Sequence, residues 1–230
     1  MNTNVKIFFV AMLFIFTTNA FAQISVGFRT GYQLNNVYTT EGFGAIAPNF
    51  LTTDEANLGL VVDIPIAGGF SVQPELAYVT KGFGLKQGGE TELLGVPIPL
   101  NAKVETKIRY VEMPVLAKYK FGDNAFKAYL AAGPSLSYAT SGQLDTKVTA
   151  LLEFDLGSVP LDLSKEKYQR FDIGATFVVG LQYDFGPISA FADARYTKGF
   201  SELYDVPLVS EKVRNKGYGF NFGLMVPIGG

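Results

Sequence analysis

The sequence predicts an all-β protein, an eight-stranded antiparallel transmembrane β-barrel with short turns at one end and long loops at the other. Three observations predict this fold. Large apolar residues alternate with small or polar residues in eight segments of strand length. The connections between these segments are alternately short and long. An N-terminal export signal precedes them, and such alternating strands cross a membrane only as a closed barrel.

The N-terminal residues have the form of a cleavable signal peptide. Lys6 precedes the short apolar run 7–16, and Ala20-Phe21-Ala22 fits the small-x-small pattern of a cleavage site. We expect residues 1–22 to be removed and residues 23–230 to form one barrel domain. The alternative is a membrane-anchoring helix, but the apolar run is shorter than the roughly 20 residues that a span requires.

Each predicted strand has one bulky face and one small or polar face, because successive side chains of a strand point to opposite sides. In the last strand the bulky positions are Tyr218, Phe220, Phe222, Leu224, Val226 and Ile228. The eight predicted strands are residues 24–34, 57–64, 70–81, 110–121, 126–138, 171–185, 188–197 and 217–228. Most are near the ~9–11 residues that a tilted strand needs to cross hydrocarbon.

The connections differ at the two ends of the predicted barrel. The tight turns are residues 67–69, 122–124 and 186–187, which contain residues that favour turns. The long segments are residues 35–56, 84–105, 141–168 and 200–215. Short periplasmic turns and long extracellular loops are typical of bacterial outer-membrane barrels. We therefore expect export through the periplasm and insertion into the outer membrane.

The bulky face could instead line the cavity of a soluble, lipocalin-like barrel. Two features favour contact with lipid. Small residues such as Gly133 and Gly180 crowd the opposite face, which suits the narrow lumen of an eight-stranded barrel. Aromatic residues also gather at both ends of the bulky face, like interfacial girdles. The girdles are Tyr32, Tyr78, Tyr138, Tyr196 and Tyr218 toward the loops, and Phe70, Tyr119, Phe121, Phe126, Tyr183 and Phe185 toward the turns.

Charged residues on the small face should point into the lumen. An unpaired buried charge is costly, so we expect these side chains to form one hydrogen-bonded network that fills the barrel. Its predicted members are Arg29, Glu75, Lys81, Glu112, Lys118, Asp172, Asp193 and Arg195, with Asp63, Lys120 and Asp184 beside them. The alternative is that these charges line a narrow path for ions.

Two further features are candidate binding surfaces. Lys107, Arg109 and Lys198 lie on the bulky face just beyond the loop-side girdle, where lipopolysaccharide phosphates would lie. The alternative, which is equally consistent with the sequence, is that these three residues lie on solvent-exposed extensions of the strands and bind nothing. Segments 84–105 and 141–168 carry apolar runs that suggest a protein partner. Alternatively, these runs pack over the barrel mouth or extend the strands into hairpins.

The sequence offers no recognisable catalytic or cofactor site. It contains no His and no Cys, so Ser-His catalysis, imidazole metal sites and thiol chemistry are excluded. It contains no phosphate-binding or dinucleotide-binding glycine motif. The net charge of −2 and the lack of a basic run do not favour nucleic acid. We expect a monomer that is not an enzyme and needs no cofactor or metal.

The segments 110–121 and 128–135, YVEMPVLAKYKF and AYLAAGPS, resemble the central hairpin of the PorT-like outer-membrane β-barrel family of Bacteroidetes. Residues 73–76 and 80–83, and 193–196 followed by Gly199, support the resemblance. The resemblance implies an eight-stranded outer-membrane barrel and transfers no catalytic residue. Some family members belong to secretion or gliding machinery. Outer-membrane barrels usually end on an aromatic residue, whereas this chain ends in 227–230, Pro-Ile-Gly-Gly.

The expected function is a structural or surface-interaction role in the bacterial envelope. The first alternative is an accessory factor of a secretion or gliding machine, and the second is a narrow porin-like channel. The expected surroundings are outer-membrane lipid, including lipopolysaccharide, and a protein partner at the two apolar segments.

Overall fold

The computed structural model describes residues 24–39, 50–93, 96–123, 125–149, 153–164, 168–202 and 213–228. The predicted signal peptide, residues 1–22, lies outside the described residues. The described chain forms ten strands: β1 (Ile24–Thr39), β2 (Phe50–Leu51), β3 (Thr53–Ala67), β4 (Phe70–Leu93), β5 (Val96–Asp123), β6 (Phe126–Thr149), β7 (Glu153–Pro160), β8 (Phe171–Phe185), β9 (Ile188–Gly199) and β10 (Val213–Ile228). No helix within this part of the chain is long and apolar enough to span a membrane.

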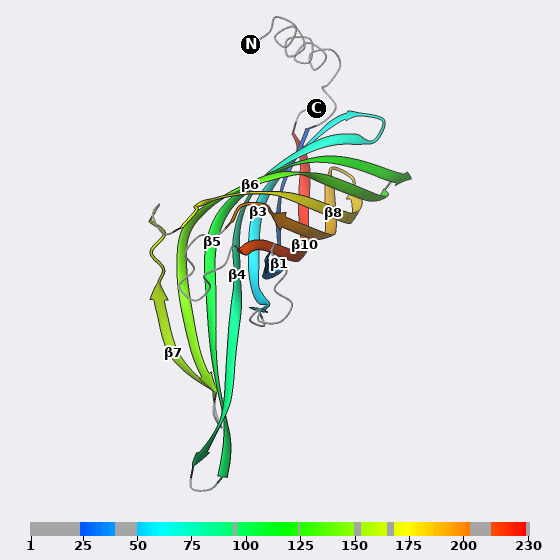
Figure 1. Ribbon diagram of the computed structural model, residues 1–230. Coiled ribbons are helices and arrows are strands. Elements are labelled where there is room, and N and C mark those ends of the chain that lie inside the picture. Colours follow the sequence, from blue (N-terminus) through cyan, green and yellow to red (C-terminus); the bar gives the residue numbers. More distant parts are fainter. Residues whose placement is uncertain are drawn as a thin grey trace, which may run out of the picture.

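Eight of these strands close into an antiparallel barrel (Figure 1). The pairing runs from β1 through β3, β4, β5, β6, β8, β9 and β10 and returns to β1. The closing pair is long, extending from Ile24 opposite Ile228 to Thr39 opposite Val213. Closure leaves no open edge between the girdles, as a membrane-spanning sheet requires. The prediction of an eight-stranded antiparallel barrel is confirmed.

The turn end of the barrel is compact because glycine permits tight reversals. Gly68 and Gly69 connect β3 to β4 with φ values of 56° and 87°, and Gly186 connects β8 to β9 with a φ value of 64°. A positive φ is strained for residues with a Cβ atom, so glycine is the natural residue at these positions. Short turns of this kind are typical of the periplasmic end of outer-membrane barrels.

The opposite end is built differently from the prediction. Segments 84–105 and 141–168 were expected to be mostly loop, but β4 and β5 stay paired out to Leu93 and Val96, and β6 continues to Thr149 and pairs with β7. Within the described residues these two segments therefore extend the strands, which was one of the alternatives for their apolar runs. Backbone pairing between β4 and β5 continues in unbroken register from Ala77 to Leu93. The prediction relied on alternation of bulky and small side chains, which is less regular in this part of the sequence. We call the parts of β4, β5 and β6 beyond the loop-side girdle, together with β7, the extension sheet; it bends away from the barrel in Figure 1.

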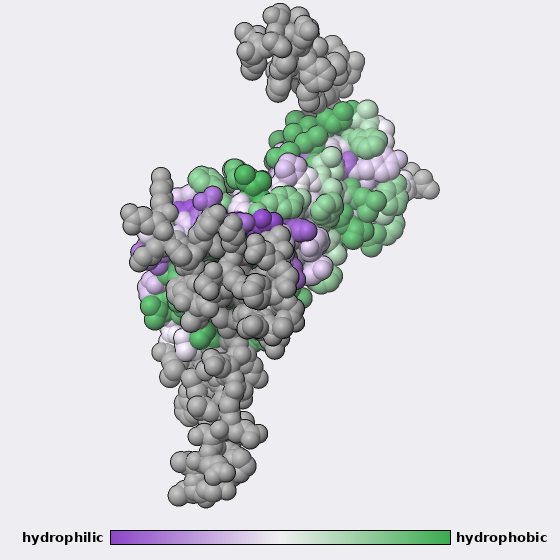
Figure 2. Space-filling view, viewed as in Figure 1, coloured by the Kyte–Doolittle hydropathy of each residue, from purple (hydrophilic) through white to green (hydrophobic). Residues whose placement is uncertain are grey.

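The outer face of the barrel between the girdles is a band of exposed apolar side chains. Phe220, Phe222 and Leu60 are exposed by 64%, 62% and 60%, respectively. Figure 2 shows hydrophobic side chains gathered over the barrel. Aromatic pairs mark both ends of the band, with Phe70–Tyr119 and Tyr183–Phe185 near the turns and Tyr138–Phe171 and Tyr196–Tyr218 near the extension sheet. An exposed apolar band between two aromatic girdles is typical of the lipid-facing surface of a membrane barrel.

Candidate functional site

Four charged side chains meet in the middle of the lumen. Arg29 on β1 donates from Nε to Oε2 of Glu75 on β4 at 2.8 Å. Arg195 on β9 donates from Nη1 to the same oxygen at 2.9 Å. Nη2 of Arg195 pairs with Oδ2 of Asp193 at 3.0 Å. All four residues are buried, so the hydrogen-bonded pairing offsets the cost of removing their charges from water.

Neutral amides complete this central group. Asn57 and Asn221 accept hydrogen bonds from Nη1 of Arg29 through their Oδ1 atoms, at 2.7 and 3.1 Å. The Nδ2 atom of Asn221 donates to Oδ1 of Asp193 at 2.9 Å. Asn221 therefore links a cation to an anion, and the group joins five strands of the barrel.

A second group lies nearer the extension sheet. Nζ of Lys81 lies 2.6 Å from Oε2 of Glu112 and 3.5 Å from Oδ2 of Asp172. Lys81 also donates to Oγ of Ser137 at 2.9 Å, and Asn215 donates to Asp172 at 2.9 Å. These contacts pin strands from both sides of the barrel to one buried ammonium group.

A third group lies nearer the turns. Nζ of Lys118 is 3.2 Å from Oδ2 of Asp63 and donates to Oε1 of Gln73 at 2.8 Å. The same ammonium lies 4.1 Å from the centre of the Tyr129 ring, a cation–π contact. Lys120 approaches Asp63 at 3.1 Å from the turn side. Near the turns themselves, Lys127 and Asp184 form a more exposed pair.

The structure thus brings the predicted lumen charges together in three groups, and Gln73 links the central group to the turn-side group by hydrogen bonds to Glu75 and Lys118. All eight are buried: Arg29, Glu75, Lys81, Glu112, Lys118, Asp172, Asp193 and Arg195. The sequence reasoning did not assign a role to the neutral partners Asn57, Gln73, Asn215 and Asn221. For Asn57, Gln73 and Asn221 the available signal was their position on the small face, because inward-facing polar groups must also find partners. Asn215 lay in a predicted loop, so no such signal existed for it.

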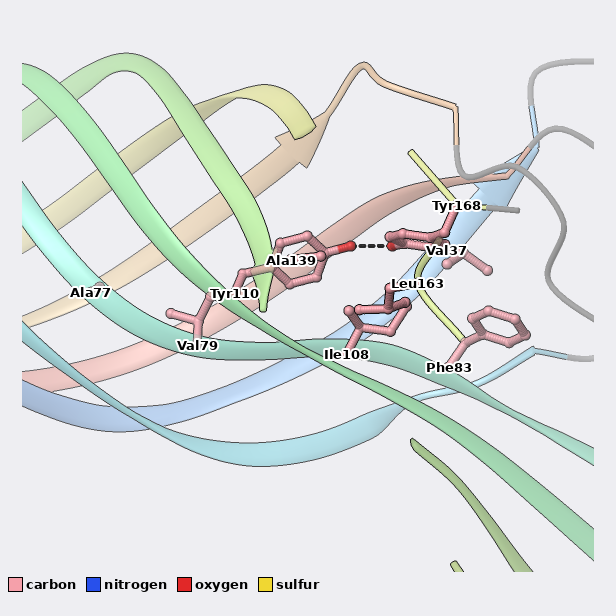
Figure 3. Packing of buried hydrophobic residues seen from close by; sticks show 9 residues of the cluster. All are labelled: Val37, Ala77, Val79, Phe83, Ile108, Tyr110, Ala139, Leu163 and Tyr168. Carbon is pink, nitrogen blue, oxygen red and sulfur yellow. Dashed lines mark hydrogen bonds between the residues drawn. The ribbon is translucent and has the colours of Figure 1, made fainter. Parts of the chain in front are cut away.

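An apolar lid covers the lumen at the loop end. Leu163 and Tyr168, from the connection between β7 and β8, are buried against residues of β1, β4 and β5 (Figure 3). The Tyr168 and Tyr110 hydroxyl groups are hydrogen-bonded to each other. The lid consists of Val37, Val79, Phe83, Ile108, Tyr110, Ala139, Leu163 and Tyr168. Packing over the mouth was one of the alternatives considered for the apolar run ending at Leu163, and Leu163 has this arrangement. Residues 153–160 of the same run instead extend the sheet as β7, which was the other alternative.

A more exposed ionic cluster lies where the extension sheet leaves the barrel. Nζ of Lys107 on β5 is 2.7 Å from Oε1 of Glu55 on β3 and 3.4 Å from Oδ2 of Asp145 on β6. It is also 3.7 Å from Oε2 of Glu105. Lys107 therefore joins the base of the extension sheet to β3. We call these four residues the Lys107 cluster.

Electrostatics within this cluster favour the charged forms. Burial lowers the pKa of Lys107, but the hydrogen bond and negative charge of Glu55 raise it by more, so the pKa lies above its ordinary value. Burial raises the pKa of Asp145, but hydrogen bonds from Ser158 and Gln143 and the charge of Lys107 hold the pKa below its ordinary value. At neutral pH both shifts therefore favour the charged forms that make the ion pair, protonated Lys107 and ionised Asp145.

The three candidate lipopolysaccharide contacts have different surroundings. Lys107 is held by carboxylates, and Arg109 donates to Oε1 of Gln143 at 3.1 Å. Lys198 is exposed, with its Nζ 5.3 Å from the centre of the Tyr38 ring. Contact with lipopolysaccharide stays a prediction for all three, and Lys198 has the arrangement best suited to it.

The chemistry of the lumen is that of charge pairing. The residues that the structure describes contain no group of three or more His, Cys, Asp or Glu side chains that could hold a metal ion. The ion pairs Arg195–Glu75 and Lys81–Asp172 link strands that are not neighbours in the barrel, which stabilises its closed form.

Comparison with known proteins agrees with this architecture. Residues 21–205 match the family model described as outer membrane protein beta-barrel domain. The chain belongs to this family. It is accordingly an outer-membrane β-barrel protein. No curated protein sequence shows a significant match to the chain.

Several solved outer-membrane proteins are similar to the chain at low sequence identity. Neisserial surface protein A is 14% identical, with 88% of this chain and 97% of that chain covered and a TM-score of 0.42. OprG from Pseudomonas aeruginosa is 14% identical, with coverages of 90% and 96% and a TM-score of 0.46. Outer membrane protein W of E. coli is 18% identical, with coverages of 87% and 97% and a TM-score of 0.41.

Proposed function

We propose that the protein is a closed, non-enzymatic outer-membrane barrel that presents its extension sheet to a protein partner at the cell surface. The observation that carries this proposal is the contrast between the two parts of the molecule. Ion pairs cross the lumen of the barrel, and an apolar lid covers them. The strands nevertheless continue beyond the loop-side girdle, where no membrane is left to span.

The extension sheet is suited to binding a protein. Val159 on β7 is 62% exposed, and β7 pairs with β6 along one of its edges. Such a strand can accept a further strand through its backbone while an exposed apolar side chain adds contact area. Asp145 accepts a hydrogen bond from Ser158 at 2.6 Å, which holds β7 against the sheet. The Lys107 cluster fixes the base of the same sheet to β3.

Photo-crosslinking in living cells tests this proposal. A photoreactive amino acid at Val159 should give one discrete crosslinked species, which mass spectrometry would identify as a protein partner. The matched control is the same amino acid at Phe171, which is also exposed but lies at the loop-side girdle on β8. Equal crosslinking at both positions, or none at Val159, would contradict a role for the extension sheet.

An accessory role in a secretion or gliding machine is the second candidate. It rests on the resemblance of segments 110–121 and 128–135, in β5 and β6, to PorT-like proteins of Bacteroidetes. Deletion of the gene should then reduce the proteins released into the medium or abolish surface movement. Unchanged secretion and movement would leave the structural or surface-interaction role as the better account.

A further inference from the structure

Two lysines lie directly opposite each other on the outer face of the barrel. Lys198 on β9 pairs in register with Lys216 on β10. Lys198 follows Tyr196 by two residues and Lys216 precedes Tyr218 by two, so both lysines lie on the outward faces of their strands. Like charges placed opposite each other across two strands repel, so this arrangement costs stability unless an anion lies between them.

The protein itself supplies no such anion among the residues that the structure describes. Glu202, close to Lys198 in sequence, pairs with Arg214 at 3.2 Å, and Asp172 points into the lumen, where it contacts Lys81 and Asn215. No ion pair is formed by either lysine within that part of the chain. The Lys198 ammonium instead lies over the Tyr38 ring. An anionic ligand would supply the negative charge that the described carboxylates do not.

The level of the pair relative to the membrane suggests the kind of anion. The Tyr196 and Tyr218 rings lie 4.9 Å apart, and they form part of the loop-side girdle. Such rings sit at the level of lipid headgroups. Lys198 and Lys216 therefore lie at the height of the outermost headgroups, where phosphate groups are concentrated.

An apolar groove begins directly below the pair. It has a volume of about 620 Å³ and runs obliquely over the lipid-facing surface from Tyr218 and Tyr196 toward Phe70. The small residues Ala132 and Ala194 line it beside the larger Phe177 and Val179, which are their partners in register on β8. An acyl chain fits a groove of this kind, since both are extended and apolar.

We propose that Lys198 and Lys216 bind a phosphate group of lipid A, while one of its acyl chains lies in the groove below. Two lysines paired in register favour a phosphate that carries no cation of its own, unlike the headgroup of phosphatidylethanolamine. This site is on the barrel wall rather than on the extension sheet. Loss of lipid A binding in a variant would therefore not contradict the proposed protein partner, and the lack of a protein partner would not contradict lipid A binding.

Binding of purified lipid A to the full mature protein in detergent tests the proposal, with native mass spectrometry as the readout. Replacing both lysines, Lys198→Gln with Lys216→Gln, should weaken binding at least tenfold. The double change to Arg should retain it, because the charge is kept. Dephosphorylated lipid A should bind the unmodified protein as weakly as lipid A binds the Gln variant. Equal binding of intact lipid A by the Gln variant and the unmodified protein would overturn the proposal.

A second pair of variants tests the groove without changing charge. Ala194→Leu should fill the upper groove and weaken lipid A binding, whereas Ala190→Leu on the same outward face of β9 should not. If both substitutions change lipid A binding to the same extent, an acyl chain does not lie in the groove. If inorganic phosphate at millimolar concentration displaces lipid A completely, the site recognises phosphate alone, and the assignment to lipid A is overturned.

Discussion

Nη1 of Arg195 lies 2.9 Å from Oε2 of Glu75, although the two residues come from opposite walls of the barrel. Their strands, β9 and β4, are separated by three strands in either direction around the ring. The bond therefore crosses the full lumen. It links parts of the chain that are 120 residues apart in sequence, and it closes the space through which an ion or solute would pass.

Removing the charge of Glu75 should destabilise the barrel strongly. The change Glu75→Gln keeps the size of the side chain but leaves Arg29 and Arg195 without their shared anion. Breaking a buried pair in this way costs about 3–5 kcal/mol. The measurement is the urea midpoint of the protein refolded into lipid vesicles, with the slope of the transition checked for constancy.

The matched control for this change is Glu202→Gln. Glu202 pairs with Arg214 at 3.2 Å in a more exposed position, and a pair of that kind contributes less than about 1 kcal/mol. If Glu75→Gln shifted the urea midpoint no more than the control, the central group would be only a weak contributor to stability.

Gly180 provides space for the Tyr129 ring, so adding one methyl group there should be destabilising. A Cβ at Gly180 would lie 2.3 Å from Cζ of Tyr129. The ring would have to move away from Lys118 and lose its hydrogen bond to Asp193. Overpacking of this kind costs about 1–3 kcal/mol. We expect Gly180→Ala to lower the urea midpoint accordingly.

A second substitution separates this steric cause from an intrinsic effect of alanine in a strand. Combining Gly180→Ala with Tyr129→Leu should give a smaller loss than the sum of the two single changes, because the shortened side chain frees the space. Strict additivity of the two losses would contradict a clash between these positions.

The barrel between the girdles could be predicted because one physical rule governs it. Lipid on one side and a narrow lumen on the other impose alternation on each strand, and that alternation is legible in segments such as 217–228. The same rule identified Arg29, Glu75 and Arg195 as inward-facing. It could not identify which charges pair, since partners such as Arg195 and Glu75 meet only after the barrel closes.

The extension sheet could not be predicted by the same rule. Beyond the girdles no lipid imposes alternation, and β4 and β5 are held together there by backbone pairing that the side-chain sequence does not encode. Packing of the apolar run ending at Leu163 over the barrel mouth was likewise predicted only as an alternative, because no lipid imposes a pattern on that segment. Tyr168 is polar enough to read as a loop residue, and its burial depends on a hydrogen bond to Tyr110, which lies 58 positions away.

The Lys107 cluster should give the extension sheet a defined pH range of rigidity. The pKa of Lys107 is higher in the folded protein than in the unfolded chain, where it is about 10.4. The ion pairs of Lys107 therefore stabilise the folded state fully below the unfolded pKa, and this stabilisation is lost as pH rises through the folded pKa. The pKa of Asp145 is lower in the folded protein than in the unfolded chain, where it is about 3.9. The contacts of ionised Asp145 therefore stabilise the folded state fully above the unfolded pKa, and this stabilisation is lost as pH falls through the folded pKa. We therefore expect a rigid sheet between about pH 4 and 10.

Distances between spin labels measure this rigidity. The chain has no native Cys, so Val159→Cys and Thr52→Cys place one label on β7 and one beside β3. The distance distribution should be narrow between these pH values and should broaden outside them. The same labelled chain with Lys107→Gln should be broad at neutral pH. A narrow distribution in that variant would show that the cluster does not hold the sheet.

The unmodified protein should not conduct ions in planar lipid bilayers. The three charged groups fill successive levels of the lumen, and the apolar lid lies above them. Removing the lid residue Tyr168 by Tyr168→Ala should still give no current, because the ion pairs below it remain. Regular current steps from the unmodified protein would contradict a closed lumen and favour the porin-like alternative.

The apolar band should meet lipid, so a charge placed within it should be costly in proportion to its depth. Leu60 lies on the outer face between the girdles and is 60% exposed in the isolated chain. We expect Leu60→Arg to destabilise the vesicle-inserted barrel by about 2–4 kcal/mol. Val159→Arg is the matched control, because Val159 is equally exposed but lies on the extension sheet and should tolerate the charge. If both changes were tolerated equally, and if the mature protein also stayed monomeric in buffer without detergent, the band would not be a membrane surface.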